Sequence, residues 1–350
     1  MPKTSAGRLM RKEIIEQPAA VTATLAAETD KIRQLAEQLR KNGVGHVLLV
    51  ARGTSDNAAM YARYAFSVIS HKITTMMATS LMTVYDVPFD FSNTLVLGIS
   101  QSGQSAGVID FVQSAKRQGA LTCALTNTPD APISRITDYS LCTHAREESS
   151  VPATKTYTTA LSVLHQLATL WAGDPKRAKA IYDVPKWQQA VLAVEDEIKD
   201  HAERYRYMEN CAVMGRGLSF CSALETALKL AQCCHVVPSP YSGVDFLHGP
   251  IASIEEGFPC FLFAPEGYAL QSMSELVDAL ERRGAETVVI SNNAAMLDRA
   301  TIGLRMPQMP EEFAPMVEVV AGQLLALHLA RHKRLNPDEP PGISKVTLTL

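Results

Sequence analysis

Hydroxyl and amide side chains gather where an apolar run gives way to a short polar loop. The apolar run Leu95–Ile99 is followed by Ser100, Gln101, Ser102, Gly103 and, two residues on, Ser105. A helical pattern begins at once, so the segment predicts a buried strand, a tight loop and a helix N-terminus. Unpaired backbone N–H groups and the positive end of the helix dipole meet there, which favours binding of a phosphate. The alternative is a serine-rich N-cap that binds no ligand.

A second polar loop, at residues 52–57, follows the first apolar run and contains Gly53, Thr54 and Ser55. From residue 44 onward, apolar runs alternate with helical patterns, which predicts an α/β fold with a doubly wound parallel sheet. The expected strands are residues 47–51, 73–78, 94–100, 121–126 and 141–144, with helices over 55–70 and 106–116. Loops at the carboxyl ends of neighbouring strands share one crevice in such a sheet, so we expect both loops to contact one ligand.

Helical and loop patterns flank this sheet. Residues 8–41 predict two helices interrupted at Pro18, the second over residues 21–40. The later segments are expected in this order: a polar loop at 146–157, a long apolar helix ending near Trp171, a linker at 174–185 and a charged amphipathic helix over 187–205.

An internal repeat relates the two halves of the chain. The segment Ala212–Ser219 echoes Leu48–Ser55, and their arginines, Arg52 and Arg216, are 164 residues apart. The same offset carries the loop after Leu95–Ile99 onto Ala264, Pro265 and Glu266, which implies two copies of one α/β unit. A proline lacks an N–H donor and a glutamate repels an anion. We therefore expect the phosphate in the first copy alone, which favours the anion site over the plain N-cap.

Composition limits the possible functions. The chain has 350 residues, 47% of them hydrophobic, so two hydrophobic cores are expected. Its formal net charge is -3 with acidic and basic residues interspersed, which makes nucleic acid an unsuitable partner. Its seven cysteines form no Cys-x-x-Cys pair and no zinc-type cluster, which indicates buried thiols in a reducing compartment. No signal-peptide pattern and no uncharged apolar stretch of about 20 residues occurs, so we expect a cytoplasmic protein.

Several motifs together resemble the sugar isomerase (SIS) domain family in its double-domain form. They are residues 10–18, Gly53-Thr54-Ser55, Ser100-Gln101-Ser102-Gly103, Val151-Pro152-Ala153-Thr154-Lys155, residues 225–230, Leu247-His248-Gly249-Pro250 and Ser344-Lys345. Within that family the chain is similar to the isomerase half of glucosamine-6-phosphate synthases and to SIS-type glucosamine-6-phosphate deaminases. The resemblance implies two tandem flavodoxin-like domains. We expect a helical arm at 1–42, a first domain at 43–173, a linker and helix at 174–200, a second domain at 201–335 and a tail at 336–350 that enters the site.

The resemblance also implies roles for individual residues. The sugar phosphate would be bound by Ser55, Ser100, Gln101, Ser102 and Ser105, with Gly53, Thr54, Lys229, Gln232 and Ser344 among the further binding residues. Backbone near Val151 would hold sugar hydroxyls, and Lys345 would lie near C1 and C2. His248, from the second subunit of a homodimer, would open the sugar ring, since an imidazole can give and take a proton near neutral pH. A turn histidine and a solvated tail lysine are the alternatives, although Ile343, Val346, Leu348 and Leu350 alternate as in a docked tail.

One position departs from the family pattern. The synthases have a glutamate three residues after the lysine of the Ala-Leu-Lys-Leu helix, and it moves a proton between C1 and C2. Here Gln232 follows Lys229, and an amide cannot act as that base. The candidate replacements are Asp245, Glu148 beside the sugar loop, and Glu225, which lies one helical turn before Lys229 and could instead orient it.

The expected function is therefore that of a phosphosugar enzyme without a metal or organic cofactor. The leading hypothesis is a glucosamine-6-phosphate deaminase that opens the ring, shifts a proton from C2 to C1 and hydrolyses the imine to fructose 6-phosphate and ammonia. An aldose/ketose phosphosugar isomerase and a fructosamine-phosphate deglycase are the enzyme alternatives. A phosphosugar sensor without catalysis is the alternative of another class, because of Gln232. The synthases' glutaminase domain, with its amino-terminal cysteine, is not expected ahead of Met1-Pro2.

Overall fold

The computed structural model describes residues 6–345, so the part of the predicted tail pattern that falls on 346–350 lies outside the described residues. The chain divides into two compact units. Among the described residues, the first, here called the N-terminal unit, comprises 16–148, 155–185 and 344–345. The second, the C-terminal unit, comprises residues 6–15, 149–154 and 186–343.

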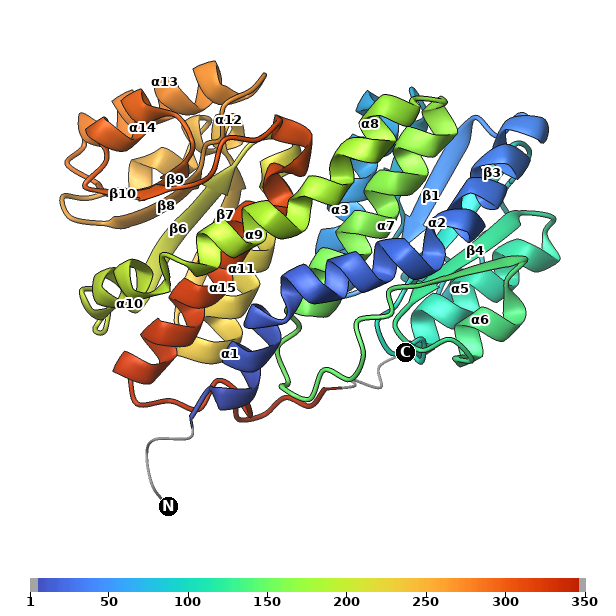
Figure 1. Cartoon of the computed structure of the whole chain (residues 1–350), viewed down its shortest axis with the longest axis horizontal. Helices are drawn as coiled ribbons and strands as arrows, with labels where there is room; N and C mark the ends of the chain where they lie inside the picture. The colour runs from blue at the N-terminus through green and yellow to red at the C-terminus, as the bar shows by residue number, and fades with distance from the viewer. Residues whose placement is uncertain (1–5, 346–350) are drawn as a thin grey trace. The chain divides into compact units, whose positions relative to one another are not determined.

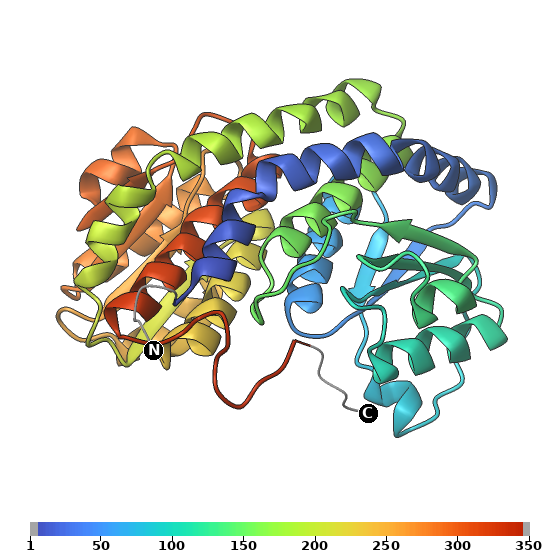
Figure 2. The same ribbon diagram turned by 60° about the horizontal axis from the view of Figure 1, so that its bottom comes forward.

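The N-terminal unit contains a parallel five-stranded sheet in the order β2-β1-β3-β4-β5 (Figure 1). Its strands are β1 (His46–Val50), β2 (Ile73–Met76), β3 (Thr94–Ile99), β4 (Leu121–Thr126) and β5 (Tyr139–Cys142). Its helices are α2 (Gln17–Lys41), α3 (Thr54–Val68), α4 (Ser80–Thr83), α5 (Ala106–Arg117), α6 (Pro132–Ile136), α7 (Lys155–Ala172), α8 (Pro175–Ala180) and the 3-10 turn η1 (Ile181–Asp183). The long helices α2 and α7 pack along each other (Figure 2).

The C-terminal unit repeats this topology, with strand order β10-β9-β8-β6-β7. Its strands are β6 (Asn210–Gly215), β7 (Val237–Ser242), β8 (Pro259–Phe263), β9 (Glu286–Ser291) and β10 (Ile302–Arg305). Its helices are α1 (Arg8–Ile15), α9 (Val184–Leu192), α10 (Glu195–Glu203), α11 (Phe220–Cys234), α12 (Gly243–Leu247), α13 (Leu270–Glu281), α14 (Ala294–Arg299) and α15 (Ala314–His332), with 3-10 turns η2 (Gly217–Ser219), η3 (Pro250–Ser253) and η4 (Glu311–Phe313).

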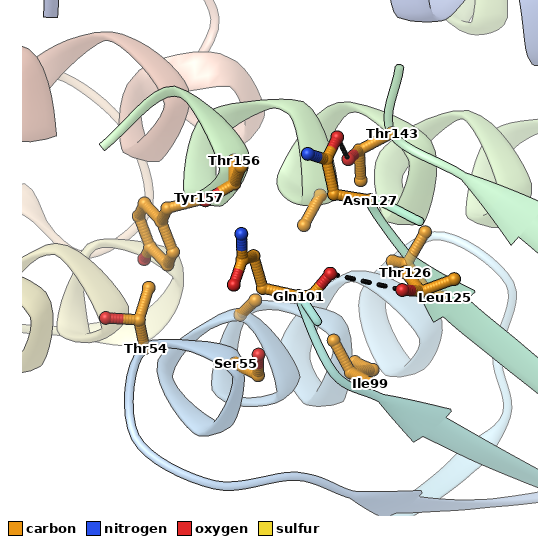
Figure 3. Close-up of a pocket in the computed structure, with 12 residues that line it drawn as sticks. Thr54, Ser55, Ile99, Gln101, Leu125, Thr126, Asn127, Thr143, Thr156 and Tyr157 are labelled. Atoms are coloured by element: carbon orange, nitrogen blue, oxygen red, sulfur yellow. Dashed lines mark hydrogen bonds between the residues drawn. The ribbon is translucent and has the colours of Figure 1, made fainter. Parts of the chain in front are cut away.

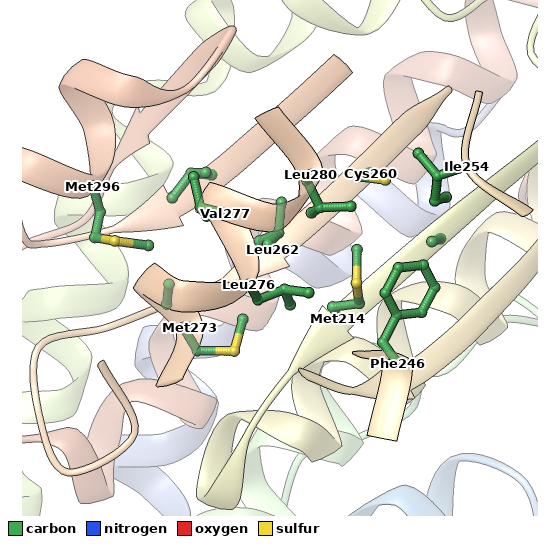
Figure 4. Close-up of a cluster of buried hydrophobic side chains, with 13 residues drawn as sticks. Met214, Phe246, Ile254, Cys260, Leu262, Met273, Leu276, Val277, Leu280 and Met296 are labelled. Atoms are coloured by element: carbon green, nitrogen blue, oxygen red, sulfur yellow. The ribbon is translucent and has the colours of Figure 1, made fainter. Parts of the chain in front are cut away.

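The predicted α/β fold and the internal repeat are both confirmed. Read from opposite edges, the two sheets have the same order, and α13 starts and ends 164 residues after α5. Each unit has its own core because both faces of a parallel sheet must be covered. In the C-terminal unit, Met214 and Leu262 on the sheet pack against Leu276 and Leu280 of α13 and against Phe246 of α12 (Figure 4).

Three local predictions were wrong. Residues 174–185 are helical rather than an open linker, because the Asp174 carboxylate caps α8 and Pro175 suits a first helical turn. The two helices expected over residues 8–41 are present, but the break between them lies at Glu16, because Pro18 falls in the first turn of α2, where its missing N–H costs nothing. The helix expected over 187–205 is two helices, and α10 begins with three acidic residues that favour a new N-terminus.

One segment, Glu311–His332, is long and apolar enough by composition to cross a membrane. Its apolar window is entirely buried inside the unit, where α15 packs against α1, α10 and α11. We therefore assign it as an interior helix of the C-terminal unit.

Candidate functional site

The loop after β3 is a tight turn held by its own serines. The Gly103 N–H donates to the Ser100 carbonyl at 3.0 Å and to the Ser100 hydroxyl at 3.1 Å, and the Gln104 N–H donates to the Ser102 hydroxyl at 3.3 Å. Gly103 has φ +65°, and a Cβ there would lie 2.3 Å from the Ala131 Cβ. The turn therefore requires glycine both for its backbone conformation and for its space.

Helix α5 starts from Ser105 without using that serine as a side-chain cap. Ser105 has extended backbone, at φ -64° and ψ 108°, and its hydroxyl makes no hydrogen bond to the N–H groups of the first turn. A serine cap would accept such a bond. The N–H groups of the first turn have no intrahelical acceptor by helix geometry, so the hydroxyl and these donors are all available to an anion.

A pocket lies at the carboxyl ends of β3 and β4, beside the starts of α3 and α7 (Figure 3). Its cavity volume is about 20 Å³, which is room for about one water molecule, so a larger ligand would occupy its open mouth as well. Gln101 lies in its middle, with Ser55 on one side and Thr156 and Tyr157 on the other (Figure 3). Its polar lining is Thr54, Ser55, Gln101, Thr126, Asn127, Thr143, Thr156 and Tyr157.

The two predicted loops are thus brought together, as expected for neighbouring strands. Gly53, at φ +58°, starts α3 and presents Thr54 and Ser55 to the pocket, while β3 presents Gln101. Ser100 is buried in the turn, and Ser102 and Ser105 are partly exposed on the same loop. Asn127, which follows β4, was not among the site residues predicted from the sequence. The rule that strand ends share a crevice could have found it, because β4 pairs with β3.

A buried carboxylate and a lysine meet behind the pocket wall. Glu148, whose side chain is fully buried, accepts hydrogen bonds from the Thr156 N–H at 3.1 Å and the Thr156 hydroxyl at 2.7 Å. Lys345 Nζ lies 2.7 Å from the same carboxylate, and its side chain is 23% exposed. Two catalytic candidates are therefore in direct contact, next to a residue that lines the pocket, and the adjacent Ser344 is exposed.

The predicted sugar loop belongs to the C-terminal unit, where two carboxylates hold it. Glu13 of α1 accepts from the N–H groups of Ser149 and Ser150 and from the Ser150 hydroxyl. The Val151 N–H donates to the Asp338 carbonyl at 2.9 Å, so that N–H already has a partner. The Asp338 carboxylate in turn accepts from the N–H groups of Leu9 and Met10 at 3.2 and 2.8 Å. Loop, first helix and C-terminal segment therefore form one hydrogen-bonded group.

The Ala-Leu-Lys-Leu helix is α11, and its polar residues are bonded to one another. Lys229 lies 2.9 Å from the Glu225 carboxylate and donates to the Gln232 carbonyl oxygen at 2.9 Å. The side chains of Glu225 and Lys229 are both fully buried. Glu225 therefore neutralises a buried cation, and Gln232 supplies that cation with a neutral acceptor.

His248 and Asp245 lie on the surface of the C-terminal unit. Both are exposed, and the His248 N–H donates to the Asp245 carbonyl at 3.1 Å at the end of α12. Gly249 follows at φ +131°, a conformation that glycine adopts without strain. The imidazole is therefore accessible to solvent in this unit, as expected either for a histidine that enters the site of a second subunit or for an ordinary surface histidine.

The cysteines and acidic residues form no metal centre within residues 6–345. All seven cysteines are free and buried. Burial raises the pKa of Cys211, Cys233 and Cys260 to about 12, so these thiols stay protonated and unreactive.

Known proteins resemble the chain over nearly its whole length. Glutamine–fructose-6-phosphate aminotransferase [isomerizing] of Thermococcus kodakarensis is 32% identical over 345 residues, which is 96% of this chain and 57% of that protein. The chain thus spans little more than half the length of that curated relative. The C-terminal domain of glucosamine-fructose-6-phosphate aminotransferase from Francisella tularensis has a TM-score of 0.87 at 25% identity, over 97% of this chain and 100% of that one.

A glucosamine-6-phosphate deaminase of Thermotoga maritima shares the fold, with a TM-score of 0.78 at 20% identity over 97% of this chain and 100% of that one. The family model for the SIS domain matches twice, at residues 38–170 and 208–333. These two stretches cover both parallel sheets and the loops that carry the pocket residues. The chain therefore belongs to the SIS domain family and is related to the isomerase domain of the aminotransferases.

Proposed function

We propose that the chain is a phosphosugar enzyme of the aldose/ketose type, and specifically a glucosamine-6-phosphate deaminase. The observation that carries this proposal is the 2.7 Å contact between Lys345 and Glu148 beside a pocket lined by Ser55 and Gln101. An anion cradle next to a buried acid–base pair suits a substrate with a phosphate at one end and a carbonyl at the other.

The phosphate is assigned to the loop after β3 and the start of α5. Ser100, Ser102 and Ser105 offer hydroxyl groups, α5 offers N–H groups, and Ser55 and Gln101 face the pocket from both sides. Charge-assisted hydrogen bonds from so many donors bind a dianion without a lysine or arginine. The same donors would not distinguish one hexose 6-phosphate from another, so specificity has to come from the sugar end.

The reaction proceeds in three balanced steps. His248, from the second subunit of a homodimer, moves the proton that opens the ring to the aldehyde. A base then removes the C2 proton and returns it to C1, which converts the 2-amino aldose to a ketose imine. Water adds to C2 and ammonia leaves, giving fructose 6-phosphate. Every atom comes from the sugar and one water, so no cofactor is needed.

Glu148 is the best-supported candidate for the carboxylate of the proton shift. Glu225 is bonded to Lys229 inside the C-terminal unit, and Asp245 is an exposed residue of α12. Glu148 is bonded to Lys345 and Thr156 at the pocket wall. Lys345, which is partly exposed, would face the C1–C2 end of the sugar, and Glu148 would hold it and exchange protons through it.

Incubation with glucosamine 6-phosphate, followed by coupled detection of ammonia and fructose 6-phosphate, tests the proposal. We expect equal amounts of both products, and loss of turnover in Lys345→Met but not in Lys41→Met, a matched lysine at the exposed end of α2. Absence of ammonia at millimolar substrate would overturn the deaminase assignment. Turnover of unaminated sugar phosphates instead would assign an isomerase.

Gln232 is the specific observation that favours a second candidate, a sensor without catalysis. As a neutral partner of Lys229 it removes the family's proton-transfer carboxylate. A sensor would be stabilised against heat by hexose 6-phosphates yet would turn none of them over, since a ligand that binds the folded state raises stability by mass action.

The shared-histidine and compartment assignments are also proposals. Mixed dimers of His248→Ala and Lys345→Met chains should regain about a quarter to a half of the activity if each site takes its histidine from the other chain. Failure to regain activity in dimers verified by mass would place the histidine within its own chain. The reduced state of seven buried thiols suits a cytoplasmic enzyme.

A further inference from the structure

Asn127, which follows β4 at the pocket, uses its side chain to bond one neighbouring loop. Its Oδ1 accepts from the Thr143 hydroxyl at 2.7 Å and from the Ala145 N–H at 2.9 Å, and its Nδ2 donates to the Arg146 carbonyl at 2.8 Å. Figure 3 shows the Asn127 amide beside the Thr143 hydroxyl. The oxygen and one N–H of the amide are therefore committed to the loop over residues 143–146.

This loop contains two residues with left-handed backbone. His144 has φ +46° and Arg146 has φ +59°. That region is disfavoured for side chains other than glycine, and it persists where the surrounding structure determines it, often at functional sites. The Ala145 N–H and the Arg146 carbonyl flank the φ angle of Arg146, and both are bonded to Asn127. The Asn127 amide therefore maintains the conformation at Arg146.

Helix α2 holds the beginning of the same loop by other contacts. The Thr24 hydroxyl donates to the Thr143 carbonyl, and the His144 Nε2 lies 2.6 Å from the Glu28 carboxylate. These contacts stay in place when the Asn127 amide is removed. Loss of the amide should thus free the end of the loop and leave its beginning attached to α2.

Glu148 follows the end of this loop. Only Glu147 lies between Arg146 and Glu148, so the conformation at Arg146 decides where the Glu148 carboxylate lies. That carboxylate accepts from the N–H and hydroxyl of Thr156 and lies 2.7 Å from Lys345 Nζ. A rotation at Arg146 would therefore displace the carboxylate and break its contact with Lys345.

The backbone of Asn127 is bonded to the loop that we assign to the phosphate. Its N–H donates to the Gln101 carbonyl at 3.0 Å, and the Thr126 hydroxyl donates to the same oxygen at 3.1 Å (Figure 3). Asn127 thus holds Gln101 through its backbone and the loop before Glu148 through its side chain. An enzyme that binds a phosphate at one end of a substrate and moves protons at the other needs a fixed spacing between the two groups.

We propose that Asn127 is the positioning residue that fixes the Glu148 and Lys345 pair relative to the phosphate loop. The inference rests on the role proposed above for Glu148 in the proton shift. Asn127 acts through the loop over residues 143–146 and not on the reacting atoms. A displacement of about 1 Å at a catalytic group can lower a rate about a hundredfold, so loss of the amide should act on kcat.

Kinetics of Asn127→Ala test this role, because the variant loses the amide and keeps its backbone bond to Gln101. We expect kcat for glucosamine 6-phosphate to fall by about ten- to a hundredfold and KM to change by less than about threefold. Asn42→Ala, at an exposed asparagine that ends α2 in the same unit, is the matched control and should change neither. A raised KM with an unchanged kcat would overturn the proposal, because it would place the amide on the substrate.

Hydrogen exchange of the Thr156 N–H tests the geometry without any turnover. Thr156 is the second residue of α7, so no carbonyl of that helix accepts from its N–H, and its acceptor is the Glu148 carboxylate. In Asn127→Ala this N–H, followed by NMR on a deuterated chain, should exchange at least about tenfold faster than in the unaltered chain. An unchanged rate would overturn the positioning role. The faster exchange, in a chain that turns over no substrate, would support the positioning role and refute the proposed reaction alone.

Two variants of Arg146 keep the test available if Asn127→Ala does not fold. Arg146 is exposed, so its replacement removes no buried side chain. Arg146→Val places a β-branched residue at φ +59°, where it is strained, whereas Arg146→Gly adopts that angle freely. The Thr156 N–H should exchange at least about tenfold faster in Arg146→Val and within about threefold of the unaltered rate in Arg146→Gly. Equal rates in the two variants would refute the proposal, because the backbone at Arg146 would then not position Glu148.

Discussion

The contact between Glu148 and Lys345 can be tested by a double-mutant cycle. Glu148→Gln keeps the shape of the side chain but turns an acceptor into an amide donor facing the Lys345 ammonium or the Thr156 hydroxyl. Lys345→Met removes the cation beside a fully buried carboxylate, which still accepts from the N–H and hydroxyl of Thr156. Both changes should destabilise the N-terminal unit.

The magnitudes follow from burial. Glu148 is fully buried and accepts hydrogen bonds from the Thr156 N–H, the Thr156 hydroxyl and Lys345, so its replacement should lower the free energy of unfolding by about 2–3 kcal/mol. Breaking a buried ion pair costs about 3–5 kcal/mol, and the 23% exposure of Lys345 reduces this to about 1–2 kcal/mol for Lys345→Met. Since both variants lose the same interaction, the double variant should be less destabilised than their sum by about 1 kcal/mol or more.

Tryptophan fluorescence can report this unit alone. The chain has two tryptophans, Trp171 on α7 and Trp187 on α9. In a Trp187→Phe background, buried Trp171 reports urea unfolding of the N-terminal unit. Glu37→Gln, at an exposed carboxylate of α2 in the same unit, is the matched control and should change the free energy of unfolding by less than about 0.5 kcal/mol. Additive effects of the two substitutions, within about 0.3–0.5 kcal/mol, would refute the contact.

Three further predictions concern other parts of the chain. Gly103→Ala should lower the free energy of unfolding by about 2–4 kcal/mol, because the turn needs φ +65° and the new Cβ would clash with Ala131. It should also abolish the binding of inorganic phosphate measured by calorimetry, and normal phosphate binding would refute the proposed phosphate site. A thiol reagent at pH 8 should label the native chain slowly and all seven cysteines after unfolding in urea, because burial keeps the thiols protonated; several fast thiols in the native state would contradict this. Asp338 joins the start of α1 to the Val151 loop, so Asp338→Ala should lower the free energy of unfolding by about 1–3 kcal/mol and raise the KM for glucosamine 6-phosphate more than it lowers kcat. An unchanged KM would show that the loop does not touch substrate.

Local patterns in the sequence were sufficient to predict the fold. Apolar runs ending in polar loops predicted β3 and β4 to within one residue at each end, because a strand buried on both faces is a continuous apolar run. The fixed offset predicted the second sheet because the repeat preserves the spacing of strands and helices. Asp174-Pro175 was ambiguous, since the same two residues can begin a turn or cap a helix, and the structure has the helix.

Long-range pairing accounts for what the sequence left open at the site. Thr54, Ser55 and Gln101 could be placed together because strand order follows from parallel α/β topology. The pair formed by Glu148 and Lys345 spans 197 residues, and no periodicity or motif indicates which tail residue meets which carboxylate. Glu318 was missed for a related reason, since a single acid in an apolar helical run is usually a solvated residue at the helix edge. Only the packing of α15 against α11 makes it a buried group.

The two copies of the fold differ in the groups that they place at the carboxyl edge of the parallel sheet. In the N-terminal unit the loop after β3 keeps hydroxyl and N–H donors, and an open pocket lies above it. In the C-terminal unit Pro265 and Glu266 make the equivalent loop unfavourable for an anion. The helices that correspond to α3 and α7 are α11 and α15, which pack against each other and bury Glu318.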